Sequence, residues 1–272
     1  MRIEPIDDGL VIPEVGQWSK RKYHFLERYL DLFTTGMKRK WPQRHYIDLF
    51  AGAGFSKLKD SGEIVCGSPL LAANVTDPFT HIHAFEVDRE RASALSARLG
   101  VLPEERQTVT CCEASDAVPI LAKRIPRRGA LCLTFIDPYG LHIDFATIAA
   151  LTSGINTDLI VLMADNMDAL RNWAKYYINN PDSNLDRFMG EPGWRSLLEA
   201  SPSDSKAERL RDAYLAKLGT ELGFVHTDSV RVQNSQGRDI YTLLYASRSP
   251  KGLEFWSKAK AVDESGQRSL FS

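Results

Sequence analysis

The chain has 272 residues, of which 43% are hydrophobic and 25% charged, and its formal net charge is −1. This composition is typical of a globular domain and excludes a fibrous repeat or an extended disordered chain. No apolar run approaches the roughly 20 residues that cross a bilayer, so we expect no membrane segment. The acidic N-terminal segment lacks the pattern of a signal peptide, and the four cysteines lack the spacing of zinc ligands. These features predict a cytoplasmic protein without a bound metal.

The first half of the chain alternates between helix-like and strand-like segments. Residues 1–17 show no hydrophobic period and predict an irregular arm, whereas apolar residues at three- and four-residue spacing predict a helix over residues 18–37. Strands are expected at residues 45–50, 81–87, 107–112 and 130–136, with helices at residues 68–75, 88–99 and 115–125. The continuous apolar run of residues 130–136 is typical of a central parallel strand covered on both faces.

The second half predicts how the sheet ends. A helix at residues 145–151 and a strand at residues 158–163 are followed by a helical insertion at residues 164–223, and then by strands at residues 224–233 and 239–247 and a last helix at residues 253–261. Five strand–helix units followed by a hairpin resemble the sheet of class I methyltransferases. We therefore expect one α/β domain over residues 1–272, with a Rossmann-like class I methyltransferase sheet that is mostly parallel and ends in an antiparallel hairpin.

The motif that carries most chemical information is YIDLFAGAG, which ends at Gly54. In an open α/β sheet, ligands bind beyond the carboxyl ends of the strands, where glycine lets the backbone approach them. Neither GxGxxG nor GK[ST] is present here, so a dinucleotide or a nucleoside triphosphate is less favoured. The segment resembles motif I of methyltransferases that use S-adenosyl-L-methionine (AdoMet). The resemblance implies that Asp48 orients the methionine amino end, that Gly52 and Gly54 admit it, and that Phe50 belongs to the same site.

Acidic residues follow the next two expected strands. Glu86 ends the second strand, where a carboxylate can accept hydrogen bonds from both ribose hydroxyls, and Asp116 follows the third, where this fold commonly contacts the adenine amine. Asp88 is interpreted as a helix cap. An acid after a strand is often only a cap, but the order glycine loop, Glu86, Asp116 favours AdoMet as the cofactor.

The turn Asp137-Pro138-Tyr139-Gly140 follows the fourth strand and resembles the [DNS]-P-P-[YFW] signature of amino-group methyltransferases. The resemblance implies that Asp137 and the carbonyl near Pro138 accept hydrogen bonds from a planar amino group while Tyr139 stacks on the base. The second proline of the signature is missing, and the alternative is a plain strand-to-helix turn capped by Asp137. The glycine segment also resembles cytosine C5-methyltransferases, but no cysteine occupies the position of their nucleophile, so C5 chemistry is not expected.

Basic residues gather near the N-terminus, in the helix and loop of residues 18–44. Eight lysines and arginines occur between residues 20 and 44 against two acids, a net charge of +6. Such a segment can hold the phosphates of DNA or RNA, and the alternative is a solvated helix face followed by a basic loop. The residues expected to contact phosphates are Lys20, Arg21, Lys22, Lys38, Arg39, Lys40 and, from the insertion, Arg171.

The ordered set YIDLFAGAG, GSPL, AFEVD, FIDPYG and YTLLYAS over residues 18–260 is similar to the three-Cys-motif partner protein family. Ala53 replaces a proline that is common in that family. The resemblance implies a methyltransferase-like fold and association with a three-Cys-motif radical-AdoMet-type protein. The main hypothesis is an AdoMet-dependent methyltransferase-like protein that modifies an amino group on a nucleic acid or on a nucleic-acid-associated protein. Two further hypotheses stay open: a non-catalytic module that binds AdoMet or a nucleoside for its partner, and an adaptor with an empty site. The sequence leaves the acceptor atom and the oligomeric state open.

Overall fold

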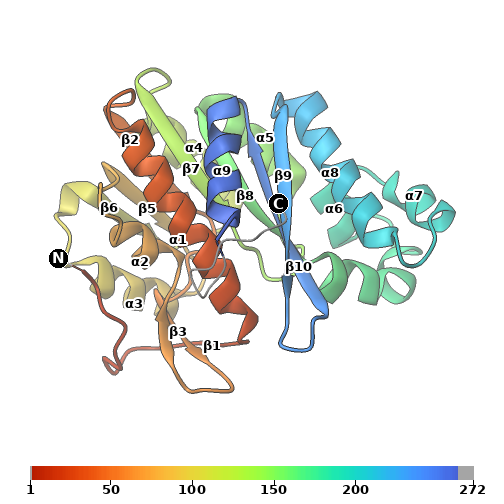
Figure 1. The fold of residues 1–272 in the computed structure, drawn as a ribbon, viewed down its shortest axis with the longest axis horizontal. Helices are drawn as coiled ribbons and strands as arrows, with labels where there is room; N and C mark the ends of the chain where they lie inside the picture. Colours follow the sequence, from red (N-terminus) through yellow and green to blue (C-terminus); the bar gives the residue numbers. More distant parts are fainter. Residues whose placement is uncertain (1, 263–272) are drawn as a thin grey trace.

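The computed structural model describes residues 2–262, and its centre is a seven-stranded sheet with the order β6-β5-β2-β7-β8-β10-β9 (Figure 1). The strands are β2 (Gln43–Asp48), β5 (His81–Phe85), β6 (Gln107–Thr110), β7 (Ala130–Ile136), β8 (Thr157–Met163), β9 (His226–Gln233) and β10 (Asp239–Ser247). Only β10 runs antiparallel to its neighbours in this sheet. The predicted fold class is therefore confirmed: the sheet is mostly parallel, Rossmann-like and closed by an antiparallel hairpin, as in class I methyltransferases.

Helices cover both faces of this sheet (Figure 1). The front of the view holds α1 (Trp18–Met37), α2 (Ser68–Ala73), α3 (Arg89–Leu99) and α9 (Pro250–Lys260). The opposite face holds α4 (Ala114–Arg124), α5 (Phe145–Gly154) and α8 (Lys206–Leu222), of which α5 contacts both others. This double cover explains why the central strands β7 and β8 are almost entirely apolar and buried.

Three short strands form a second sheet that the sequence pattern did not predict. They are β1 (Glu14–Val15), β3 (Phe55–Leu58) and β4 (Ile64–Cys66), paired in the order β1-β3-β4. The arm expected to be irregular thus contributes a strand, because Glu14 pairs with Lys57 of a segment far away in the sequence. The main strands also end earlier than expected: β2 at Asp48 and β5 at Phe85.

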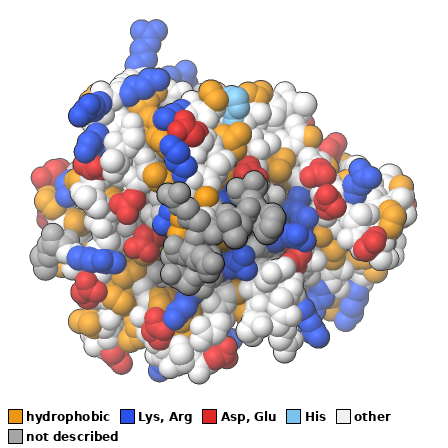
Figure 2. Space-filling view, viewed as in Figure 1, with side chains coloured by type: hydrophobic (Ala, Val, Ile, Leu, Met, Phe, Trp, Pro, Cys, Tyr) orange, Lys and Arg blue, Asp and Glu red, His pale blue; other side chains and the backbone are white. Residues whose placement is uncertain are grey.

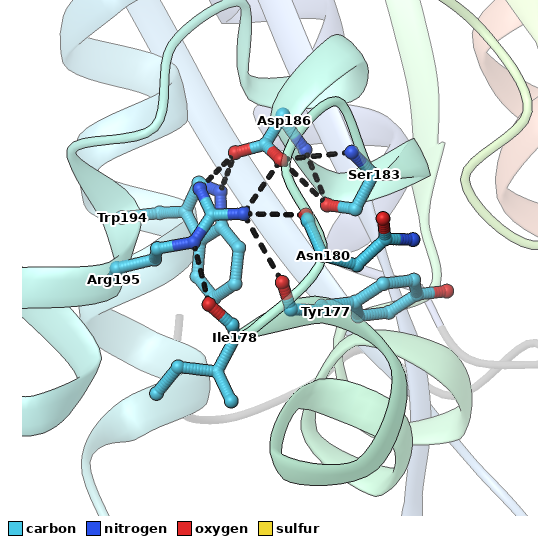
Figure 3. Close-up of polar contacts among 7 residues, drawn as sticks. All are labelled: Tyr177, Ile178, Asn180, Ser183, Asp186, Trp194 and Arg195. Carbon is cyan, nitrogen blue, oxygen red and sulfur yellow. Dashed lines mark hydrogen bonds and ion pairs between the residues drawn. The ribbon is translucent and has the colours of Figure 1, made fainter.

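The helical insertion is folded around one arginine (Figure 3). It begins with two π-helical segments, η2 (Asp165–Leu170) and η3 (Trp173–Tyr177), and continues with α6 (Asn184–Met189), α7 (Trp194–Ala200) and α8. The Arg195 guanidinium forms an ion pair with Asp186 and donates to the carbonyls of Tyr177 (3.1 Å), Ile178 (3.0 Å) and Asn180 (2.8 Å). These bonds join the turn after η3 to α6 and α7. Within residues 2–262, no helix has the length and apolar character needed to cross a membrane.

Candidate functional site

Three neighbouring strands end together at one edge of the main sheet, which we call the carboxyl edge. Asp48, the last residue of β2, lies opposite Ala84 of β5 and Phe135 of β7. The segments that follow these strands are the glycine loop, the turn at Glu86 and the turn at Asp137. Because parallel strands present their carboxyl ends on one side, the register brings these three segments to the same place.

The glycine loop is fastened to Glu86. Gly52 has a φ of +64° and donates its N–H to Oε2 of Glu86 (2.8 Å), while Oε1 accepts from the N–H of Asp88 (2.9 Å). A Cβ at Gly52 would meet no atom within 4 Å, so the backbone here faces open space, as the approach of a ligand requires. Gly54 differs, because a Cβ there would lie 3.0 Å from the side chain of Leu95. The first glycine leaves room for a ligand, and the second allows the loop to pack.

Asp48 lies beneath the loop and has no exposed surface. Its carboxylate accepts from the Tyr46 hydroxyl (3.0 Å) and from the Phe50 N–H (3.2 Å). Burial raises the pKa of Asp48 to about 7, although these hydrogen bonds act in the opposite direction. These bonds hold the Asp48 carboxylate against the backbone of the glycine loop, whose residue Phe50 is half-buried. A direct contact between Asp48 and a methionine amino group stays a prediction.

After the third strand of the sequence pattern, β6, two acidic residues follow, and the expected one, Asp116, lies farther from the end of the strand than Glu113 does. Asp116 is exposed in the first turn of α4, six residues beyond the end of β6. Glu113 comes sooner, at the N-cap of α4, and its exposed side chain does not cap the helix. An adenine contact by Asp116 stays a prediction, and Glu113 is a second candidate that the sequence interpretation missed.

The turn after β7 holds the residues that the sequence analysis assigned to an amino acceptor, and this role stays a prediction. Asp137 directly follows β7 and is half-buried, Pro138 is buried, and Tyr139 is 91% exposed. Gly140 lies against the insertion, since a Cβ there would be 2.5 Å from Oδ2 of Asp168. The turn thus places a carboxylate and a solvent-facing aromatic ring next to each other at the carboxyl edge.

A lysine that the sequence interpretation assigned to phosphate binding faces Asp137 instead. The Nζ of Lys22 donates to Oδ2 of Asp137 (2.5 Å), and Lys22 is only 7% exposed. Burial alone would lower the pKa of Lys22, but the adjacent Asp137 carboxylate raises it well above its usual range. The phosphate role expected for Lys22 is therefore wrong in this structure, because its ammonium is buried and paired.

The insertion adds Asp168 to the surroundings of the turn. Oδ1 of Asp168 accepts from the hydroxyl of Tyr177 (2.6 Å) and from Nδ2 of Asn172 (2.7 Å), which leaves Oδ2 toward Gly140. Arg171 is exposed in the same part of the insertion. No signal in the sequence could single out Asp168, because its contact with the turn joins segments from two different connections of the sheet.

The remaining basic residues do not form a single surface. Lys20, which pairs with Glu63 (2.5 Å), and the half-buried Arg21 lie in the first turn of α1. Exposed Lys38, Arg39 and Lys40 follow its last turn. A helix of 20 residues is about 30 Å long, so the two groups lie at opposite ends of α1. Within the described part of the chain, no group of three His, Cys, Asp or Glu side chains is arranged to hold a metal ion.

No protein-family model matches the chain, and no curated protein sequence matches it. Among solved structures it is similar to human methyltransferase-like protein 13 in complex with SAH, with 13% identity, a TM-score of 0.48, and 93% of this chain and 96% of that chain covered. The O-methyltransferase from Bacillus cereus in complex with SAH has 11% identity, a TM-score of 0.46 and coverage of 81% and 80%. An rRNA methylase from Streptococcus thermophilus has 13% identity, a TM-score of 0.44 and coverage of 84% and 95%. At these identities the fold assignment rests on the strand order of the sheet itself.

Proposed function

We propose that the chain is an AdoMet-dependent methyltransferase-like protein that modifies an amino group on a nucleic acid or on a nucleic-acid-associated protein. The observation that carries this proposal is the arrangement of the carboxyl edge. There the glycine loop fastened to Glu86 lies beside a turn that presents the Asp137 carboxylate and the exposed ring of Tyr139. Methyl transfer to nitrogen needs a loop that can hold the cofactor beside a turn that can accept hydrogen bonds from an amino group.

The residues at the glycine loop fit AdoMet. Gly52 faces open space, and each oxygen of Glu86 has accepted only one hydrogen bond from the backbone. A carboxylate has about four acceptor positions, so Glu86 keeps the capacity to accept from two ribose hydroxyls. When bound, AdoMet would supply an electrophilic methyl group. The chain's own contribution at this loop is to orient the cofactor.

The turn after β7 fits an amino acceptor. Lys22 holds Oδ2 of Asp137, and within residues 2–262 Oδ1 has no hydrogen-bond partner, so this oxygen can accept from an amino group. That bond keeps the nitrogen lone pair directed at the methyl group and strengthens as positive charge develops on the nitrogen. Tyr139 can stack on a base, a contact typically worth about 1–3 kcal/mol.

A second candidate function is a non-catalytic module that binds AdoMet or a nucleoside for a three-Cys-motif radical-AdoMet-type protein. The observation in its favour is the Lys22–Asp137 pair, since a carboxylate already matched by a buried ammonium is a weaker hydrogen-bond acceptor. The missing second proline of the turn is consistent with the same function. This hypothesis predicts cofactor binding without methyl transfer.

The test is transfer of labelled methyl groups from AdoMet to nucleic acid and protein from cells that lack this chain. We expect labelled amino groups, and we expect Asp137→Asn to lower turnover by about two orders of magnitude while AdoMet affinity stays within about twofold. Because Asp137→Asn leaves Lys22 buried without a counter-charge, stability must be controlled.

The control is the double variant Lys22→Met/Asp137→Asn. It should recover most of the stability lost in the single variant, because neither charge remains buried, but it should not recover turnover. If turnover returns together with stability, Asp137 has only a structural role. If the wild-type chain binds AdoMet and labels nothing, the non-catalytic module is the better account.

A further inference from the structure

Basic side chains also gather at the edge of the sheet opposite to the carboxyl edge. Two loops meet there, because Gln43 at the start of β2 pairs with Ala130 at the start of β7 and donates its N–H to the carbonyl of Gly129 (3.4 Å). One loop follows α1 and the other follows α4. We call this surface the distal basic edge, and its residues are Lys38, Arg39, Lys40, Lys123, Arg124, Arg127 and Arg128.

The charges on the distal basic edge are almost uncompensated. All seven side chains are exposed, and residues 38–44 and 123–129 contain no acid. Lys38 pairs with Asp77 (2.9 Å), whereas the other six form no ion pair within residues 2–262. Figure 2 shows Lys and Arg side chains gathered at the upper left of the view, over the end of α1 and the loop before β7. Six cations without an ion pair in the described part of the chain, four on the two adjoining loops and two in the last turn of α4, attract a polyanion.

This surface is separate from the candidate site. β2 has six residues, which span about 20 Å, and α1 is about 30 Å long. Lys22 at one end of α1 contacts Asp137, whereas Lys38 follows the other end. A molecule that touches both the distal basic edge and the turn Asp137–Gly140 must therefore be extended. At 3.4 Å per base pair, this separation corresponds to roughly six to nine base pairs.

We propose that the distal basic edge binds the phosphate backbone of a nucleic acid, anchoring it while a distant nucleotide reaches the turn Asp137–Gly140. The large exposed hydrophobic side chains of the described residues all lie outside residues 38–44 and 123–129. A surface that inserts into a membrane combines its cations with such apolar side chains, so the composition argues against insertion and favours a nucleic acid. Anchoring by the backbone positions the nucleic acid without reading its sequence. The arrival of a nucleotide at the turn Asp137–Gly140 rests on the proposed function, whereas the phosphate contact at the distal basic edge does not.

The experiment measures fluorescence anisotropy of an RNA duplex of about 20 base pairs, long enough to reach both ends, over a range of salt concentrations. Three variants each lose two positive charges: Arg39→Ala/Lys40→Ala, Arg127→Ala/Arg128→Ala, and the control Lys57→Ala/Lys59→Ala. The control lysines are exposed on the β3–β4 hairpin and have no ion pair within residues 2–262. Each of the first two variants should reduce the slope of log affinity against log salt by about 1.4–1.8, and the control should leave it unchanged.

Three results would overturn the proposal: no binding at low salt, a flat salt response, or an equal loss of slope in the control variant. Phosphatidylserine vesicles form a parallel arm. The surface is a membrane contact if the vesicles bind the wild-type chain, fail to bind the same two variants, and RNA does not bind at all. Calorimetric binding of S-adenosylhomocysteine should be unchanged in all three variants. If the proposed function is wrong, S-adenosylhomocysteine will not bind or no methyl group will be transferred. Either outcome would leave the RNA result unaffected.

Discussion

Lys22 shows how one side chain can connect a helix to the turn at Asp137. Its ammonium is buried against Asp137, and its stem leaves the same face of α1 as Leu26 and Leu30, which are completely buried. Removal of one partner of such a pair typically costs about 3–5 kcal/mol, because the other charge is left buried. The pair therefore fixes the orientation of Asp137 relative to α1 before any acceptor arrives. Lys22 is a positioning residue for the turn.

Asp48 makes the stability of the fold depend on pH. Its folded-state pKa is about 7, whereas that of an unfolded aspartate is near 3.9. Between these values the folded chain holds a proton that the unfolded chain has lost, so the contribution of Asp48 to stability falls as pH rises, by up to about 4 kcal/mol. Asp48→Asn cannot ionise. Relative to wild type, this variant should gain stability between pH 4 and pH 7.

Urea unfolding of both proteins at pH 5 and pH 7 measures this change directly. The free-energy difference between wild type and Asp48→Asn should shift in favour of the variant at the higher pH. A difference that is the same at both values would show that Asp48 is ionised throughout, and the burial argument for its raised pKa would then fail.

At the scale of elements, local pattern explains most of the main sheet but not the pairings between distant segments. The glycine loop, the turn at Asp137 and the hairpin of β9 and β10 follow from short motifs. The strand β1 does not, because its two residues become a strand only by pairing with β3. The sequence pattern also predicts strand ends up to two residues too late, since apolar residues such as Leu49 continue into the buried loop.

The candidate site was predictable in part for the same reason. The register of β2, β5 and β7 brings Gly52, Glu86 and Asp137 to one edge, as the order of the motifs indicates. Lys22 carried a signal that was overlooked: it lies four residues before Leu26, on the apolar stripe of α1, so a buried position was the better interpretation. Asp168 carried no such signal, because it reaches Gly140 only through the folded insertion.

The insertion is joined to the sheet by a buried ion pair, which gives a prediction for this element. Nη1 of Arg211 in α8 donates to Oδ2 of Asp165 (2.7 Å), a carboxylate without exposed surface that also accepts from Thr242 of β10 (2.8 Å). Arg211→Met should destabilise the chain by about 3–5 kcal/mol, because it leaves Asp165 buried without its counter-charge. Urea unfolding measures the loss.

Two further variants show whether the buried charge is the cause. Arg209→Met, on the same helix but exposed, should change stability by less than about 0.5 kcal/mol. Asp165→Leu/Arg211→Met removes both charges and should recover most of the loss. Equal destabilisation by the single variant and the double variant would attribute the effect to packing of the arginine stem instead.

At the scale of the whole molecule, the sheet separates two surfaces with different chemistry. The carboxyl edge carries the glycine loop, Glu86 and the turn at Asp137. The surface at the opposite end of the strands is the distal basic edge. Along α1, the sixteen residues from Lys22 to Lys38 span about 24 Å, and Lys22 joins the first of these positions to the turn at Asp137. This separation is the basis of our proposal that an extended nucleic acid is held at one surface and modified at the other.

The central claim is that the carboxyl edge binds AdoMet, and calorimetric titration with S-adenosylhomocysteine tests it most directly. The wild-type chain should bind one equivalent, and Glu86→Ala should weaken binding by about 2–3 kcal/mol, because two charge-assisted hydrogen bonds to the ribose are lost. Glu90→Gln is the matched control, since its carboxylate is exposed on α3 four residues away, and it should bind like wild type. No heat of binding in the wild-type chain, or equal affinity in Glu86→Ala, would contradict the account.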